Sequence, residues 1–146
     1  EYWRRIAPGL AADRVDRRTT AETVLREMET TFKTSAEQLK TSKPILLGQF
    51  NETSPQIRIF TNNSMAMQII NKIGLQNAWQ GQFEQFGFNT IGIEALTKFE
   101  QATFLYIAQG DNVHLKRLQT NPVWQGLQFV QEKRLYAIGA ETWTFG

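Results

Sequence analysis

The chain has 146 residues, of which 41% are hydrophobic, 12% aromatic and 21% charged. This length suits a single domain, and the apolar share predicts a hydrophobic core and excludes intrinsic disorder by composition. No apolar run approaches the roughly 20 residues of a membrane-spanning helix. The absence of cysteine excludes disulfides, thiolate zinc sites and cysteine nucleophiles, and the single histidine, His114, excludes a multi-histidine metal site within the chain.

The net charge of +2 comes from residues 1–18, which hold five arginines and three acidic residues. The rest of the chain holds eleven Lys and Arg against eleven Asp and Glu. A nucleic-acid-binding protein usually carries its excess positive charge as a patch on the folded face. We therefore predict no nucleic-acid partner and interpret 1–18, which contains Pro8-Gly9, as a linker.

The two ends of the sequence lead us to expect a fragment of a longer protein. Residues 1–5 lack the apolar core of a secretory signal. The chain stops at Gly146, directly after an aromatic cluster, without a closing element.

A long amphipathic helix is predicted over residues 19–41. Thr19 and Glu22 have the spacing of a capping box, in which the two side chains bind free amides of the first turn. Apolar residues then recur at helical spacing, at Ala21, Val24, Leu25, Met28, Phe32, Ala36 and Leu39. Such a helix is roughly 30 Å long, which is long for a domain of this size.

Strands and helices alternate after residue 42. Apolar runs predict strands at 45–50, 57–60, 103–107 and 134–138. Helices are predicted at 65–73, capped by Asn63 or Ser64 and ended by Gly74, at 94–99, from 110–112 through Leu118, and from Asn121-Pro122 through Val130. Residues 76–92 show no clear periodicity. This order predicts an α/β fold, a three-layer α/β/α lobe with a mostly parallel sheet.

Ligands of such sheets bind beyond the carboxyl ends of the strands. These ends are Phe50 with Asn51, the loop 108–112 and the tail 139–146. Together with the loop 79–88, they are the segments in which we expect the functional residues.

The motifs of common enzyme and nucleotide sites are absent. No G-x-G-x-x-G follows the strand at 45–50, and the chain has no P-loop and no G-x-S-x-G motif. Asp111 and His114 have a spacing at which they can pair, but no serine lies nearby in the sequence. Glu94 and Glu100 would lie on different faces of a short helix. We therefore predict no enzyme.

Aromatic residues in predicted loops are the positive signal. They are Trp79, Phe83, Phe86, Phe88, Trp143 and Phe145. Rings on the loops of a rigid scaffold often contact ligands, because they offer a large area at a low cost in rotamer entropy. The alternative is that some of them fill the core beneath the loops, which we expect first of Phe83 and Phe88.

Two motifs carry a family resemblance. The stretch Asn121-Pro122-Val123-Trp124-Gln125-x-Leu127-x-x-Val130-x-x-x-Arg134-x-Tyr136 resembles a signature of periplasmic siderophore-binding proteins, the substrate-binding components of bacterial iron-uptake ABC importers. Asn63-Ser64, the helix to Gly74 and the following Asn77-Ala78-Trp79-Gln80-Gly81 resemble the second-lobe helix and loop of the hydroxamate-binding subgroup. The resemblance runs from about Thr19 to Gly146.

The resemblance implies a domain organisation. In that family one long helix joins two α/β lobes, and the siderophore lies in the cleft between them. Residues 19–41 would be this connecting helix, 42–146 the C-terminal ligand-binding lobe, and 1–18 a linker or the remnant of an N-terminal lobe that is missing here together with its iron-facing arginine. The implied location is the periplasm or the extracytoplasmic face of the cell membrane.

The implied function is binding of a ferric hydroxamate siderophore and its delivery to the permease of an ABC importer. No cofactor or protein metal ligand is implied, because the siderophore already holds the iron. Catecholate siderophores, haem and cobalamin are the nearest alternative cargoes. A small-molecule α/β enzyme and a protein-interaction lobe are alternatives of other classes.

The resemblance also assigns roles to residues. The implied ligand contacts are Phe50, Trp79, Phe86, Trp143 and Phe145. Phe86 stands where the subgroup has a Trp, and Phe145 replaces a Tyr, so one N–H and one hydroxyl donor are lost. Glu94 matches an acidic residue that docks onto arginines of the permease. From the sequence alone, Glu94 is a first-turn carboxylate favoured by the helix dipole.

Overall fold

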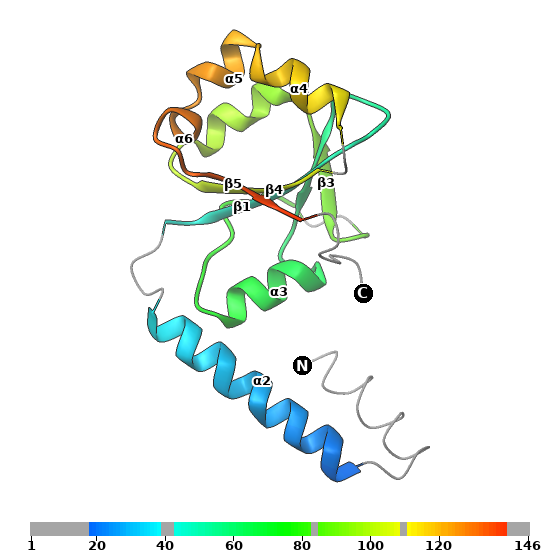
Figure 1. The fold of residues 1–146 in the computed structure, drawn as a ribbon, viewed down its shortest axis with the longest axis vertical. Coiled ribbons are helices and arrows are strands. Elements are labelled where there is room, and N and C mark those ends of the chain that lie inside the picture. The colour runs from blue at the N-terminus through cyan, green and yellow to red at the C-terminus, as the bar shows by residue number, and fades with distance from the viewer. Residues whose placement is uncertain (1–17, 39–42, 83–84, 109–110, 140–146) are drawn as a thin grey trace.

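Five strands form one mixed sheet in a computed structural model that describes residues 18–38, 43–82, 85–108 and 111–139 (Figure 1). The strands are β1 (Ile45–Phe50), β2 (Ile57–Phe60), β3 (Phe88–Ile91), β4 (Thr103–Ile107) and β5 (Leu135–Ile138), in the spatial order β3-β2-β1-β4-β5. None of the described helices is long and apolar enough to cross a membrane.

Four of the five strands run in one direction. β4 pairs in parallel with both β1 and β5, whereas β2 is antiparallel to both β1 and β3. The predicted, mostly parallel sheet is therefore confirmed, with β2 as the exception. β3 was not predicted, because its four residues lie at the sheet edge and pair only with β2.

Helices cover both faces of the sheet, which confirms the three-layer arrangement (Figure 1). The short helices η1 (Ile93–Phe99), α4 (Val113–Gln119), α5 (Pro122–Gly126) and α6 (Gln128–Gln131) cover one face. The other face carries α3 (Met65–Lys72), and α2 (Arg18–Gln38) lies beyond α3 and contacts it.

α2 matches the predicted long helix with one correction. It already includes Arg18, so Thr19 lies inside the helix and is not its N-cap. The side chains of α2 that the structure describes are all partly or fully exposed, and Val24 is 49% exposed.

The core has one part on each side of the sheet. The larger part contains Leu46, Phe104 and Trp124. The rings of Phe104 and Trp124 pack edge-to-face at a centroid distance of 6.2 Å. The smaller part, under α3, contains Leu47 and Met67. Successive strand residues point to opposite faces, which explains why the unbroken apolar run of β1 fills both parts.

The predicted helix from Asn121 to Val130 is two helices. Leu127 has φ −64° and ψ 130°, an extended conformation that ends α5 and begins α6. The side chain of Leu127 is 1% exposed. The burial of Leu127 accounts for the break, because a continuous helix would point this side chain in another direction. The side chains of Ser64 and Asn121 each accept a backbone N–H of the first helical turn, which confirms these two predicted caps. Asn112 caps α4 in the same way.

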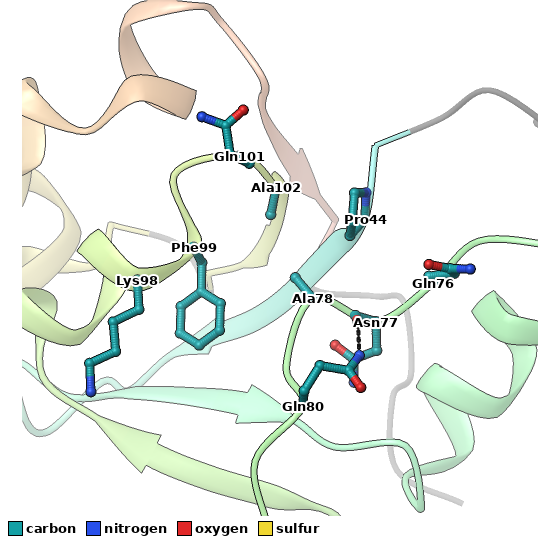
Figure 2. A pocket seen from close by; sticks show the side chains of 9 residues that line it. All are labelled: Pro44, Gln76, Asn77, Ala78, Gln80, Lys98, Phe99, Gln101 and Ala102. Atoms are coloured by element: carbon teal, nitrogen blue, oxygen red, sulfur yellow. Dashed lines mark hydrogen bonds between the residues drawn. The ribbon is translucent and has the colours of Figure 1, made fainter.

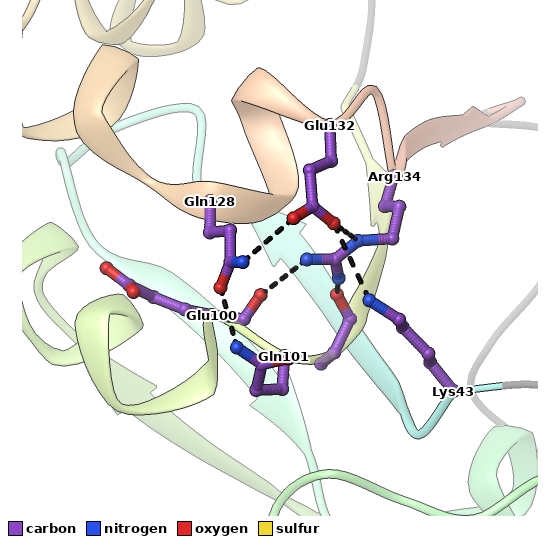
Figure 3. Close-up of polar contacts among 7 residues, drawn as sticks. Lys43, Glu100, Gln101, Gln128, Glu132 and Arg134 are labelled. Atoms are coloured by element: carbon purple, nitrogen blue, oxygen red, sulfur yellow. Dashed lines mark hydrogen bonds and ion pairs between the residues drawn. The ribbon is translucent and has the colours of Figure 1, made fainter.

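Arg134 joins two turns at the amino end of the parallel strands (Figure 3). Its guanidinium donates to the carbonyl oxygens of Ala102 and of Glu100, the latter at 2.8 Å, and to a carboxylate oxygen of Glu132 at 2.7 Å. Lys43 lies 3.5 Å from the same carboxylate. The first described residue of the lobe is thereby tied to the turns before β4 and β5.

Candidate ligand-binding surface

The turn before β3 displays an aromatic ring. Phe86 is 75% exposed. The next residue, Gly87, has φ +76°, and a Cβ atom there would lie 3.0 Å from the Cα of Ser64, the N-cap of α3. The N–H of Thr61 donates to the carbonyl of Gly87 at 2.9 Å. These contacts fix the turn against the start of α3, so Phe86 is presented on a rigid support.

A groove of about 600 Å³ runs along β3 and brings two predicted ligand residues together. Its lining consists of Trp79, Gln82, Phe86, Phe88, Asn89, Thr90 and Ile91. The ring of Trp79 packs on Phe99 at a centroid distance of 5.5 Å, and its indole N–H lies 3.5 Å from the carbonyl of Gln82. Trp79 is therefore a half-buried wall of the groove, whereas Phe86 is its exposed ring.

Phe88 and Phe83 were the rings expected to fill the core. Phe88 packs against the core under α3, which confirms that expectation. Phe83 lies outside the described residues, as do the predicted contacts Trp143 and Phe145.

Phe50 lies in the core and not on an open surface. It is 3% exposed, and its ring packs against Tyr106 and Trp124 at centroid distances of 5.5 and 6.0 Å. It faces α5, on the side of the sheet opposite to Phe88. The prediction that Phe50 contacts the ligand is corrected on this point, because a ring covered by other rings has no surface left for one.

The carboxyl ends of β1 and β4 meet as predicted. The side-chain amide of Asn112, which caps α4, donates to the carbonyl of Asn51 at 3.1 Å. Trp79 lies at the other end of β1, because Ala78 donates its N–H to the carbonyl of Ile45. The loop 79–88 and the carboxyl-end loops therefore form separate surfaces among the described residues.

Glu94 is exposed in the first turn of η1, three residues after β3 ends. β3 runs in the direction of β1, so η1 begins at the carboxyl edge of the sheet. The carboxylate folds back over the backbone, since a Cβ on Gly92 would lie 2.8 Å from one of its oxygens. The described residues contain no group of three His, Asp or Glu that could hold a metal ion.

A second pocket, of about 440 Å³, lies at the start of β1 (Figure 2). Asn77 donates its side-chain amide to the carbonyl of Phe60 at 3.1 Å, and Gln80 donates to the carbonyl of Asn77 at 2.6 Å. These bonds hold the loop after α3 beside the sheet. None of the predicted ligand residues that the structure describes lines this pocket.

Sequence reasoning overlooked Arg58. Its guanidinium carbon lies 5.1 Å from the ring centroid of Phe88, on the α3 side of the sheet. The signal was available in the strand Ile57-Arg58-Ile59, because alternation places the arginine opposite to two buried isoleucines.

The comparisons with known proteins agree with this fold. The sequence model of the periplasmic binding protein family matches residues 10–142. The iron(3+)-hydroxamate-binding protein FhuD of Escherichia coli K12 is 25% identical over 137 residues, which are 92% of this chain and 46% of that protein. The chain therefore spans about half the length of the curated relative it matches.

Two solved structures illustrate the range of similar folds. The siderophore-binding protein FhuD from Vibrio cholerae, with Fe³⁺-Desferal bound, has a TM-score of 0.81 at 21% identity, over 94% of this chain and 52% of that one. The triscatecholate siderophore-binding protein FeuA from Bacillus subtilis has a TM-score of 0.72 at 16% identity, over 87% of this chain and 48% of that one. At these identities the likeness establishes the fold.

Proposed function

Because the chain belongs to the periplasmic binding protein family, we propose that it is the connecting helix and C-terminal lobe of an extracytoplasmic protein that binds a ferric siderophore for an ABC importer. Residues 19–41 would form the connecting helix and 42–146 the lobe, with a second lobe supplying the other wall of the cleft. The observation that carries the proposal is the match of 92% of this chain to a protein named for iron(3+)-hydroxamate binding.

The exposed ring of Phe86 supports this function. A siderophore brings its iron fully coordinated, so a binding protein need supply only shape, apolar contact and hydrogen bonds. Phe86 offers an open ring on a turn fixed against α3, and Trp79 adds a second ring in the same groove. Preorganised aromatic contacts bind with a low entropy cost. Trp143 and Phe145 remain predicted contacts.

A hydroxamate cargo is the finer part of the proposal. It is supported by the name of the 25%-identical relative and by the Desferal-bound structure of the same fold. The fold also occurs in a triscatecholate-binding protein, so the cargo must be decided by measurement.

Docking to the permease is proposed for Glu94. Its carboxylate is exposed at the carboxyl edge of the sheet, at the start of η1. A carboxylate in that position is available to an arginine of a membrane partner.

Quenching of tryptophan fluorescence tests the proposal. The two-lobe protein that contains this chain is titrated with a ferric trihydroxamate, a ferric tricatecholate, haem and cobalamin, and iron-free hydroxamate serves as the control. We expect saturable quenching by the ferric trihydroxamate. Saturation by haem or cobalamin alone would replace the siderophore as the cargo, and no saturable binding of any of the four would overturn the function.

A further inference from the structure

Three polar side chains form a row across the sheet on the α3 side. Gln49 on β1 is the cross-strand partner of Arg58 on β2, and Arg58 is the partner of Thr90 on β3. Side chains directly opposite each other share a face of the sheet. Alternation places this row on the same face as Phe60 and Phe88, which pack under α3.

Two members of the row have unused hydrogen-bonding groups. The side-chain oxygen of Gln49 is buried and has no hydrogen-bond partner. Arg58 has no hydrogen bond or ion pair within the described parts of the chain, and its one polar interaction is with the ring of Phe88. Buried polar atoms in native proteins are nearly always paired, so an unpaired acceptor beside an unpaired cation needs an explanation.

One end of the row lies at the groove along β3, because Thr90 and the ring of Phe88 line that groove together with Phe86. Gln49 is the cross-strand partner of Ile107, which is the partner of Ile138 at the end of β5. At the other end of the sheet, the ring that Arg58 covers belongs to Phe88, two residues after the exposed Phe86.

We propose that Arg58 is a specificity-determining residue that contacts negatively charged oxygens of the siderophore and extends the cargo to anionic ferric complexes. The proposal rests on the proposed function. A guanidinium presents five N–H donors in a planar fork that matches paired oxygens and never loses its charge. The ring of Phe88 restrains the side chain, and the oxygen of Gln49 can accept one N–H while the others bind the ligand.

Charge distinguishes the cargoes that such an arginine favours. Three singly charged hydroxamates balance Fe³⁺, so a ferric trihydroxamate core is neutral. Three doubly charged catecholates leave a ferric tricatecholate with a net negative charge. A buried or half-buried cation therefore contributes more to binding of the second kind of complex than of the first.

Substitution of Arg58 tests this role in the two-lobe protein. Dissociation constants are measured for ferrichrome, a neutral ferric trihydroxamate, and for ferri-bacillibactin, an anionic ferric tricatecholate, with the wild type, Arg58→Gln and Arg58→Lys. We expect Arg58→Gln to weaken ferri-bacillibactin binding about ten- to hundredfold and ferrichrome binding less than about threefold. Arg58→Lys, which keeps the charge and loses the fork, should lie between.

Arg117→Gln on α4 is the matched control, because it removes the same charge from an exposed position on the other side of the sheet. Arg117→Gln should change neither of the two dissociation constants. Melting temperatures check that every variant is folded. Binding of ferrichrome without ferri-bacillibactin by the wild type, or equal effects of Arg58→Gln on both complexes, would overturn the role of Arg58 and leave the proposed function standing. Binding of neither complex would overturn both.

Discussion

Phe86 in the turn before β3 and Phe88 at the start of β3 are two neighbouring rings that differ in burial. Phe86 is 75% exposed, whereas Phe88 packs against the core under α3. An exposed ring contributes little to folding, so substitution of Phe86 tests its proposed ligand contact with little effect on stability, whereas Phe88 contributes to the core.

Phe86→Ala in the two-lobe protein should weaken siderophore binding by about 1–4 kcal/mol, the usual range for a central interface aromatic. Its melting temperature should stay near that of the wild type. Phe88→Ala is the matched control and should lower the melting temperature, because it leaves a cavity in the core. Fluorescence titration and thermal unfolding of both variants check this, and unchanged affinity of Phe86→Ala would remove this ring from the site.

Glu94→Arg should separate binding from transport. The side chain is exposed at the start of η1, so its charge reversal should leave siderophore affinity intact and reduce uptake by whole cells. Rim charges act mainly on encounter and orientation of partners. Glu22→Arg, at an exposed position of α2, controls for the change in net charge. Normal uptake by Glu94→Arg would exclude a docking role for this residue.

At the scale of elements, the hydrogen bonds of Arg134 and Glu132 hold together the turns that precede β4 and β5 (Figure 3). The hydrogen bond from Arg134, followed by that from Gln128, lowers the pKa of Glu132 below its ordinary value of 4.5. A carboxylate whose pKa is lowered by folding stabilises the folded state above its unfolded pKa, and this contribution disappears as the pH falls through the folded pKa.

Glu132→Gln therefore tests the network through its pH dependence. The variant should melt at a lower temperature than the wild type at neutral pH, and the difference should shrink as the pH falls below about 4.5. Glu27→Gln, on the exposed face of α2, should show no such trend. A difference in melting temperature that is constant between pH 7 and pH 3 would contradict the assigned role of the charge.

Elements with strong local signals were predictable from the sequence. The apolar runs of β1 and β4 and the cap of α3 by Ser64 depend on neighbours in the chain. The edge strand β3 and the break at Leu127 depend on distant partners, namely β2 and the core, and left no periodic pattern.

The candidate site was predictable in its residue types and less so in its geometry. Phe50 was assigned to the cleft from the family resemblance and its place at the end of β1, and it lies in the core. Alternation could not correct this, because a strand that is buried on both faces does not tell which side a ligand occupies. The groove that joins Trp79 and Phe86 arises from the pairing of β3 with β2, which the sequence did not reveal. Arg58 was overlooked although alternation in its strand separates it from two buried isoleucines.

At the scale of the whole molecule, α2 offers an apolar stripe that the described lobe does not bury. Val24 is 49% exposed, and Leu25, Met28 and Phe32 are partly exposed. Larger apolar patches on a monomer usually mark an interaction surface. With Phe50 in the core, we expect copies of the chain to associate through the stripe on α2 and the exposed ring of Phe86.

We expect the 146-residue chain alone to self-associate in solution. Static light scattering should give a mass above that of a monomer, and the double substitution Val24→Glu and Phe32→Glu should shift the mass toward the monomer. Thr23→Glu and Thr31→Glu, at exposed neighbouring positions of the same helix, provide the matched control and should leave the mass unchanged. A wild-type chain that stays monomeric at high concentration would contradict this use of α2.

Under the proposed function, the affinity of the chain alone depends on its share of the cleft. The chain covers 46% of the length of its hydroxamate-binding relative, so it is expected to provide one of two walls. The translational and rotational entropy lost on association costs an estimated 4–15 kcal/mol and does not halve when the contact area halves. Losing one wall should therefore remove much more than half of the binding free energy.

We expect the chain alone to bind ferric trihydroxamates with a dissociation constant of about 1 mM or weaker, which corresponds to about −4 kcal/mol. Isothermal calorimetry of the chain and of the two-lobe protein, run side by side, measures the difference. Restoring the second lobe should restore tight binding, because both walls then contact one rigid ligand. Micromolar binding by the chain as a monomer would show that the groove along β3 and the ring of Phe86 suffice, and would contradict a cleft shared by two lobes.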